Sequence, residues 1–345
     1  MDLSIFVILF QDGVVSAAIY ALLALAMVLV FTVTRVIFVP IGEFVSFGAL
    51  SLAALELGRA PGTVWLLLLF GLASGIVTLW SERRVLTARI WLRTLAETVV
   101  LPVAVAALVL LLAPHRPSQW LQVLLALAVT VPLGLFLYGA VYRPLAQASV
   151  LVLLIVSVAL HIALVGLGLI FFGAEGSRTA PLSQVSLTLG DLSLSGQALA
   201  VLVVTAVLIA GLYLFFGRTL IGKALQATAV NRLGAQLVGI SPLFSGRFAF
   251  GLAALIGTAG GILISPLTTI YYDTGFIIGL KGFVAAIIGG LVSYPVAAGA
   301  ALLVGIIESF ASFFASELKE VIVFMIIVPI LFVRSRRSLV LEDEE

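Results

Sequence analysis

Residues 14–57 read VVSAAIYALLALAMVLVFTVTRVIFVPIGEFVSFGALSLAALEL, a stretch that is apolar over most of its length. About 20 consecutive apolar residues are needed to cross the hydrocarbon core of a bilayer, so this stretch predicts two membrane spans, near 14–33 and 37–57. The whole chain has the same character, because 63% of its 345 residues are hydrophobic, 10% are charged and its mean hydropathy is +1.30. Such values are far from those of soluble globular domains. We therefore expect an all-α, polytopic transmembrane helix bundle.

The same criterion predicts about 10–11 membrane segments, all within one transmembrane domain that covers residues 1–345. The further spans lie near 63–80, 97–113, 119–141, 150–173, 197–216, 248–270, 276–292, 295–314 and 320–333. With the N-terminus outside and the C-terminus inside, most basic residues face the cytoplasm, as the positive-inside rule requires. These are Arg35, Arg83, Arg84, Arg89, Arg93, Arg143, Arg218, Lys223, Arg232, Arg247, Arg334, Arg336 and Arg337, whereas Arg59, Arg116, Arg178 and Lys319 would lie outside and Lys281 inside the membrane.

Enzymatic chemistry is disfavoured by what the sequence lacks. The chain has no cysteine, no H-E-x-x-H motif and no G-x-S-x-G nucleophile elbow, and His115 lies far from His161 in sequence. Residues 217–224, GRTLIGKA, resemble a P-loop, but Ala224 replaces the hydroxyl residue and the segment follows a membrane span instead of a strand. The net charge of +2, without a dense basic run, does not indicate nucleic acid binding. We expect no catalytic site, no metal site and no bound cofactor.

A polar stretch from Gly217 to Arg247, GRTLIGKALQATAVNRLGAQLVGISPLFSGR, interrupts the apolar chain. It is too long for a turn between two spans, is rich in helix-forming residues and contains basic but no acidic residues. We expect a cytoplasmic helical loop that docks to another protein, the alternative being an amphipathic loop helix without a partner. On the outer side, the loop at 174–197 alternates polar and apolar residues around Gly190 and Asp191, which predicts a short β-hairpin.

Two of the predicted spans are unusual for plain helices. The span near 37–57 has Pro40 and Gly42 beside Glu43 in its first turns, and the span near 276–292 places Lys281 among glycines. Each could be a broken or re-entrant segment that faces protein or a watery cavity, or else a glycine-rich packing surface. Close helix packing is also indicated by small-xxx-small pairs, which are Gly71 and Gly75, Gly257 and Gly261, and Gly275 and Gly279.

Four ionisable residues lie within predicted spans: Glu43, His161, Lys281 and Glu308. Each would cost about 2.5–3.5 kcal/mol at the bilayer centre, so each should face a partner or water. We predict that Lys281 and Glu308 pair across the ninth and tenth spans and hold the ninth in place, the alternative being separate contacts with backbone or water. We expect His161 to be a packed, hydrogen-bonded residue rather than a proton relay.

Several stretches resemble the permease subunits of branched-chain amino acid type ABC transporters. They are residues 18–50 (AIYALLALAMVLVFTVTRVIFVPIGEFVSFGAL), 141–160 (VYRPLAQASVLVLLIVSVAL), 222–242 (GKALQATAVNRLGAQLVGISP), 248–263 (FAFGLAALIGTAGGIL) and 279–309 (GLKGFVAAIIGGLVSYPVAAGAALLVGIIES). The resemblance covers roughly residues 14–57 and 142–333. The region from Glu82 to about Leu121 has no counterpart in it. The basic start of that region predicts an amphipathic surface helix that leads into an added span.

The resemblance implies that a short cytoplasmic coupling helix fits a groove in a separate ATPase subunit, where ATP and Mg would be bound. The family's Glu-Ala-Ala-x-x-x-Gly pattern falls on Leu233, Gly234, Ala235 and Gly239, of which the last two match. Small residues at these two positions would allow close helix approach. The candidate coupling residues are Lys223, Ala224, Gln226, Asn231, Arg232, Ala235 and Gly239.

The resemblance also implies a solute pathway between this subunit and a second, homologous permease, with a periplasmic substrate-binding protein at the outer face. Gly42, Glu43, Lys281 and Glu308 are the candidates for its lining. Of the family's Asn-Phe-Ala-His-Gly-Glu motif, residues 38–43 keep only the Gly-Glu. The implied solutes are branched-chain amino acids or related small polar molecules, and the implied location is the bacterial cytoplasmic membrane, surrounded by lipid. The alternatives are a self-sufficient secondary transporter or channel, and a scaffold without transport.

Overall fold

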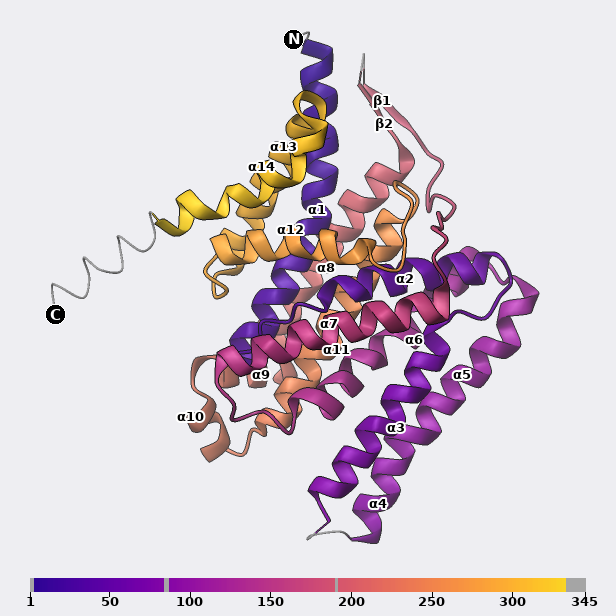
Figure 1. Cartoon of the computed structure of the whole chain (residues 1–345), viewed down its shortest axis with the longest axis vertical. Coiled ribbons are helices and arrows are strands. Elements are labelled where there is room, and N and C mark those ends of the chain that lie inside the picture. The colour runs from indigo at the N-terminus through magenta and orange to yellow at the C-terminus, as the bar shows by residue number, and fades with distance from the viewer. Residues whose placement is uncertain (1–2, 84–86, 190–191, 333–345) are drawn as a thin grey trace, which may run out of the picture.

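The structure is a computed structural model that describes residues 3–83, 87–189 and 192–332. It is a bundle of α-helices with one two-stranded sheet (Figure 1). Its elements are α1 (Leu3–Thr34), α2 (Ile41–Glu56), α3 (Thr63–Ser81), α4 (Ala88–Leu95), α5 (Leu101–Leu112), α6 (Gln119–Leu137), α7 (Val150–Phe172), β1 (Leu187–Leu189), β2 (Leu192–Leu194), α8 (Gly196–Arg218), α9 (Leu220–Val230), α10 (Arg232–Leu237), α11 (Pro242–Ile264), α12 (Thr274–Ile288), α13 (Tyr294–Phe314) and α14 (Lys319–Met325). The predicted all-α polytopic fold is confirmed.

Within the described residues, 8 helical segments are long and apolar enough to cross a membrane, and each overlaps a predicted span. α2 and α12 have 16 and 15 residues. At 1.5 Å per residue they are about 24 and 23 Å long, which is less than the roughly 30 Å hydrocarbon core. The last predicted span, 320–333, begins as α14, and its residue 333 lies outside the described residues, as do Arg84, Arg334, Arg336 and Arg337.

The region after α3 forms one continuous helical segment, Ala88–His115, in which a π-helical turn at Ala96–Val100 joins α4 to α5. The predicted span near 97–113 is therefore present, and the basic α4 leads directly into it. The predicted hairpin is confirmed as well, because β1 and β2 pair antiparallel with Leu187 opposite Leu194. Gly190 and Asp191 lie outside the described residues.

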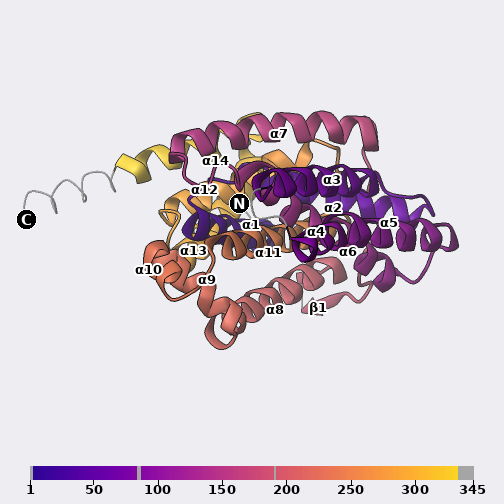
Figure 2. The same ribbon diagram turned by 90° about the horizontal axis from the view of Figure 1, so that it is seen from below.

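The centre of the bundle is formed by α1 and α11, and the other long helices surround them (Figure 2). Of the most apolar window of α1, 78% of the residues are buried, compared with 11% for α8. Because lipid is as apolar as a protein core, α8 remains apolar although it is mostly exposed in this chain. α2 and α12 pack against the central pair, so they lie inside the bundle despite their short length.

The two short helices touch each other at their first turns. Gly42 is the second residue of α2 and Gly275 the second residue of α12, and a Cβ on either glycine would overlap the backbone carbonyl of the other. Gly279, one turn further along α12, packs on the backbone of Gly42. Of the two alternatives left open by the sequence, the glycine-rich packing surface is therefore confirmed. Each segment is a single short helix that follows a non-helical stretch, and whether either one is re-entrant stays a prediction.

The pairs α1–α2 and α11–α12 are built alike and run in opposite directions. Each consists of a long helix, a non-helical segment and a short helix. Val33, near the end of α1, packs with Ala249, near the start of α11, so the long helices are antiparallel. Gly48 of α2 packs on Thr258 of α11, and Gly282 of α12 packs on Leu23 of α1. Inverted pairs of helices are typical of many transporters, whose solute sites lie near the repeat interface.

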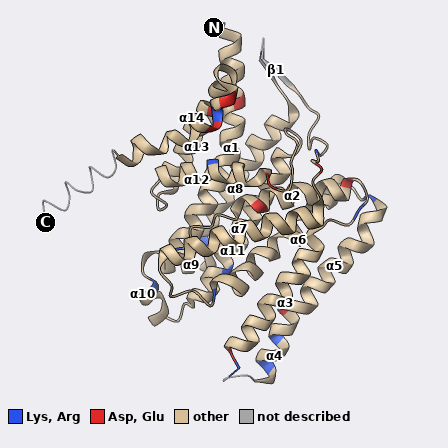
Figure 3. Ribbon diagram, viewed as in Figure 1, with Lys and Arg blue, Asp and Glu red and all other residues tan. Residues whose placement is uncertain are grey.

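Contacts between helix ends define two ends of the bundle. At the end that carries α9 and α10, here called the coupling end, Arg143 contacts Glu82 and Arg232 contacts Ala146. At the opposite end, which carries β1 and β2 and is here called the hairpin end, Arg116 donates to the carbonyl of Leu57. In Figure 3, basic residues are visible on α4 and α10, both at the coupling end. The placement of Arg143 and Arg232 at one end and of Arg116 at the other agrees with the two sides of the membrane predicted for these residues.

Candidate functional site

The start of α2 carries a buried carboxyl group with an imidazole partner. Glu43, which is 1% exposed, lies in the first turn of α2, where the helix dipole favours a negative charge. Its Oε1 is 2.5 Å from Nδ1 of His161 on α7, and the His161 ring stacks on Phe276 of α12 with 4.0 Å between ring centroids. Oε2 of Glu43 has no hydrogen-bond partner among the described groups. Three helices therefore bring polar and aromatic groups together where α2 and α12 begin, and His161 is packed and hydrogen-bonded as expected.

Ser46 joins the two short helices by hydrogen bonds. Its Oγ accepts from the backbone N–H of Gly275 at 2.8 Å and donates to the carbonyl of Tyr271 at 3.0 Å. The first N–H groups of a helix have no partner inside the helix, so Ser46 satisfies one of those of α12 from a different helix. Sequence reasoning missed this residue, although its spacing of four from Gly42 places both on one face of α2.

Lys281 lies at the centre of a second buried polar cluster. Its Nζ is 2.5 Å from Oε1 of Glu308 on α13 and 3.1 Å from Oε1 of Glu320 on α14. The hydroxyl of Tyr20 on α1 donates to Oε2 of Glu308 at 2.5 Å. The predicted pairing of Lys281 with Glu308 is thus confirmed. Tyr20 and Glu320 were missed, because nothing in their local sequence places them beside α12.

The candidate pathway residues lie inside this chain and not on its surface. Gly42 and Glu43 are buried, Lys281 is 4% exposed, and the Glu308 side chain is mostly buried. The structure brings them into two separate clusters, one at the start of α2 and one around the Lys281 amino group. Their role as pathway lining stays a prediction, and it would require α2 and α12 to move relative to their neighbours.

The polar stretch between α8 and α11 folds as two short helices, as its sequence predicts. Thr219 caps α9 by accepting from the N–H of Gly222 at 2.9 Å, and Asn231 caps α10 by accepting from the N–H of Gly234 at 2.8 Å. Threonine and asparagine are favoured at such positions because they satisfy free N–H groups. The cap at Asn231 ends α9 and turns the chain into α10.

One side of α10 is attached to the bundle. Ala235 is buried, and the Arg232 guanidinium donates to the carbonyl of Ala146 in the loop after α6. Gly239 follows α10 with a φ of 87°, a left-handed conformation that favours glycine, and a Cβ there would meet no atom of this chain within 4 Å. The left-handed turn alone therefore explains why a glycine occupies position 239. The candidate coupling residues that lie exposed are Lys223, Gln226, Asn231 and Gly239, whereas Ala224, Arg232 and Ala235 are partly or fully buried.

The other side of the α9–α10 segment presents large apolar side chains to the outside. Val230 is 87% and Leu237 82% exposed, and Leu233 and Val238 are also largely exposed. We call these four residues the apolar edge. The segment lies between two spanning helices and at one end of the bundle, beyond the apolar length of α8 and α11. Sequence reasoning missed the apolar edge because it considered only basic and small residues.

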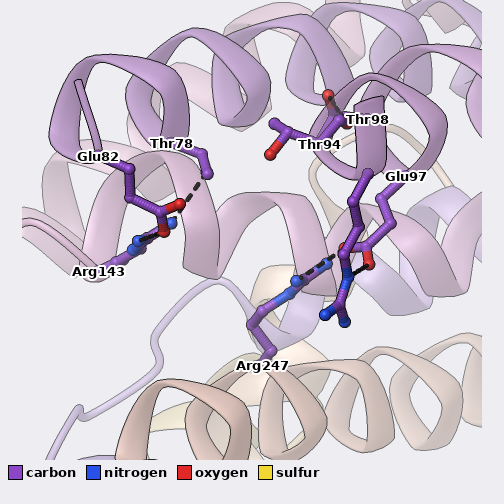
Figure 4. A network of polar contacts seen from close by, with 8 residues as sticks. Thr78, Glu82, Thr94, Glu97, Thr98, Arg143 and Arg247 are labelled. Carbon is purple, nitrogen blue, oxygen red and sulfur yellow. Dashed lines mark hydrogen bonds and ion pairs between the residues drawn. The ribbon is translucent and has the colours of Figure 1, made fainter. Parts of the chain in front are cut away.

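Two groups of polar contacts lie near the coupling end of the bundle (Figure 4). The segment that consists of α9 and α10 is called the coupling segment below. Glu97 accepts from Arg93 at 2.8 Å and from Arg247 of α11 at 3.1 Å. Arg143, after α6, donates to Glu82 at 2.6 Å and to Thr78 at 3.0 Å. The first group connects the segment from Ala88 to His115 with the central helix α11, and the second connects α3 with the turn after α6. The spacing of four between Arg93 and Glu97 was the only signal for these contacts in the sequence.

Comparisons with known proteins agree with this architecture. Residues 94–331 match the family described as branched-chain amino acid transport system / permease component. The high-affinity branched-chain amino acid transport system permease protein BraD of Pseudomonas aeruginosa is 30% identical over 244 residues, which are 67% of this chain and 79% of that protein. The permease protein LivH of Escherichia coli K12 is 26% identical over 218 residues, 60% of this chain and 70% of the relative. No solved structure matches significantly.

The range of the family match corrects one expectation. The region from Glu82 to about Leu121 was expected to have no counterpart, but the match begins at residue 94 and includes most of it. Residues 14–57, in contrast, lie outside the matched range. The match covers well over half of the chain, and it includes the coupling segment, α11, α12 and α13. This chain is therefore a multi-pass membrane protein that belongs to the family of branched-chain amino acid transport system permease components.

Proposed function

We propose that this chain is the permease subunit of an ABC importer that carries branched-chain amino acids, or related small polar solutes, across a bacterial cytoplasmic membrane. The names of its relatives support this class of solute. The energy would come from separate ATPase subunits that bind ATP and Mg. A second, homologous permease would complete the pathway, and a periplasmic binding protein would deliver the solute at the hairpin end.

The observation that carries this proposal is the apolar edge, which consists of Val230, Leu233, Leu237 and Val238. Isolated exposed apolar residues are ordinary, but four largely exposed apolar side chains within residues 230–238, on a segment outside the spanning helices, indicate a protein interface. A secondary transporter or channel has no need for such a surface. We therefore assign the coupling end to the cytoplasm and the apolar edge to the groove of an ATPase subunit.

The attachments of α10 provide a route for motion from the ATPase to the core. Arg232 links α10 to the loop between α6 and α7, and Pro242 begins α11 four residues after the end of the apolar edge at Val238. α11 in turn contacts α2 closely through Gly257 and Gly261. A displacement of α10 would thus reach the crossing of α2 and α12 through packed helices, as in other hinge and shear movements.

Replacing Leu233 with aspartate is expected to abolish binding of the ATPase subunits and solute uptake, because it places a charge in the centre of the apolar interface. The substitution should leave folding unchanged, since Leu233 is exposed in this chain. The measurements are co-purification with the ATPase subunits and ATP-dependent uptake by proteoliposomes that contain the whole complex.

Val185→Asp is the matched control, because Val185 is as exposed as Leu233 but lies at the hairpin end. It should retain ATPase binding and uptake. Uptake by the purified chain without any ATPase subunit would contradict the proposal and favour a secondary transporter. Full uptake with Leu233→Asp would show that the ATPase docks elsewhere.

A further inference from the structure

A cavity of about 570 Å³ lies at the coupling end, between α8 and α9 on one side and α1 and α13 on the other. It is separate from both polar clusters described above. Its inner wall is apolar and includes Leu25 and Leu29 of α1 with Ile209 and Phe216 of α8. Figure 2 shows α8 and α9 along one side of the bundle. The volume is within the range of ordinary ligand sites, about 300–1,000 Å³.

The depth of the cavity corresponds to one leaflet of a bilayer. Ile209 and Arg218 mark the two ends of the part of α8 that lines it. At 1.5 Å per residue they are about 14 Å apart along the helix axis. That is close to half of the roughly 30 Å hydrocarbon core. The cavity therefore extends from the coupling end to about the middle of the membrane.

The charged and amide groups of the cavity lie at its outer end, and the only other polar side chains that line it among the described residues are the hydroxyls of Tyr213 and Tyr294. Arg218 is the last residue of α8 and Gln226 lies on α9, and both line the cavity there. Arg218 is exposed, and among the described residues it has neither a hydrogen bond nor an ion pair. None of the residues that line the cavity in the described part of the chain is acidic. A ligand that fits must combine a negative charge at the membrane surface with an apolar part that reaches inward.

We propose that this cavity binds an anionic phospholipid of the cytoplasmic leaflet. The phosphate contacts Arg218 and Gln226, and an acyl chain fills the space between α1, α8 and α13. Basic pockets between membrane helices on the cytoplasmic side bind anionic head groups in this way. The lipid would support the corner between α8 and α9, from which the coupling segment begins. The inference depends on the coupling end facing the cytoplasm and not on the transported solute.

The test is native mass spectrometry of the purified chain in mild detergent, with phosphatidylglycerol or phosphatidylethanolamine of identical acyl chains added. Phosphatidylglycerol should remain bound and phosphatidylethanolamine should not. Arg218→Gln should reduce the bound fraction of phosphatidylglycerol about ten-fold, whereas Arg59→Gln, an exposed arginine near the hairpin end, should leave it unchanged. Ala298→Leu, which fills the apolar part of the cavity, should reduce binding as well, and thermal unfolding verifies that each variant is folded.

Three outcomes would overturn the proposal. Equal retention of the two lipids would show that the head-group charge is not recognised. Retention unaffected by Arg218→Gln would place any bound lipid elsewhere. A lipid-free dimer, resistant to added phosphatidylglycerol, would show that a second copy of the chain covers the cavity.

Discussion

Replacing Gly42 with alanine should destabilise the fold by about 2 kcal/mol and strongly reduce transport, because a Cβ at position 42 would overlap the backbone carbonyl of Gly275. Neither backbone can give way without separating α2 from α12. The better helix propensity of alanine offsets at most about 1 kcal/mol of this cost. Thermal unfolding in detergent and uptake by the reconstituted complex measure the two effects.

Gly166→Ala on α7 is the matched control, since a Cβ there would meet no atom within 4 Å. It should leave the stability unchanged or raise it slightly. Gly275→Ala probes the same contact from the other helix and should reproduce the loss, because its Cβ would overlap the carbonyl of Gly42. Identical melting of Gly42→Ala and Gly166→Ala would mean that close contact of the two glycines does not hold α2 and α12 together.

Lys281→Met is expected to destabilise the protein by about 3–5 kcal/mol, because it leaves the mostly buried carboxylate of Glu308, and the partly exposed carboxylate of Glu320, without their ammonium partner. Removing all three charged groups together, in Lys281→Met with Glu308→Gln and Glu320→Gln, should restore part of the stability. No unpaired charge then remains in the interior. Unfolding in detergent compares the single with the triple variant, and Lys319→Met is the control for loss of a nearby lysine.

Glu320, the second carboxylate beside Lys281, changes how a reversal of the Lys281 and Glu308 charges must be designed. Exchanging the charges of Lys281 and Glu308 alone would place a carboxylate at position 281, next to Glu320. The exchange should therefore rescue stability only in a Glu320→Gln background. If neither the triple neutral variant nor this reversal is more stable than Lys281→Met, the ion pairs do not hold α12 in place.

Much of the architecture was predictable because it depends on consecutive residues. The apolar runs predicted each of the helices that are long enough to cross a membrane. The alternation over VSLTL and LSLSG predicted the strand pairing of β1 with β2. Pro40 and the glycines near Lys281 indicated which two segments differ from plain spanning helices, and these form the short helices α2 and α12. These features follow from local hydropathy, turn chemistry and helix propensity, which neighbouring residues determine.

The candidate site was only partly predictable. The cost of burial indicated that Glu43 and Lys281 need partners. Together with the resemblance, it predicted Glu308 as the partner of Lys281, which the structure confirms. It did not identify Ser46, Tyr20 or Glu320. A serine, a tyrosine or a glutamate at the start of a helix is unremarkable in its own segment, and its importance depends on which helix packs beside it.

Hydropathy and the spacing of charges along the chain established a polytopic helical membrane protein with an exposed helical segment at 217–247. Both signals are properties of neighbouring residues, so the sequence alone contains them. The tertiary structure decided which groups meet inside the bundle. Ser46 and Gly275 are 229 residues apart in the chain, yet one hydrogen bond joins them. Such a contact exists because Gly42 and Gly275 have no side chains to keep α2 and α12 apart. The closeness of α2 and α12 depends on how whole helices pack together, and this packing cannot be read from a single segment of sequence.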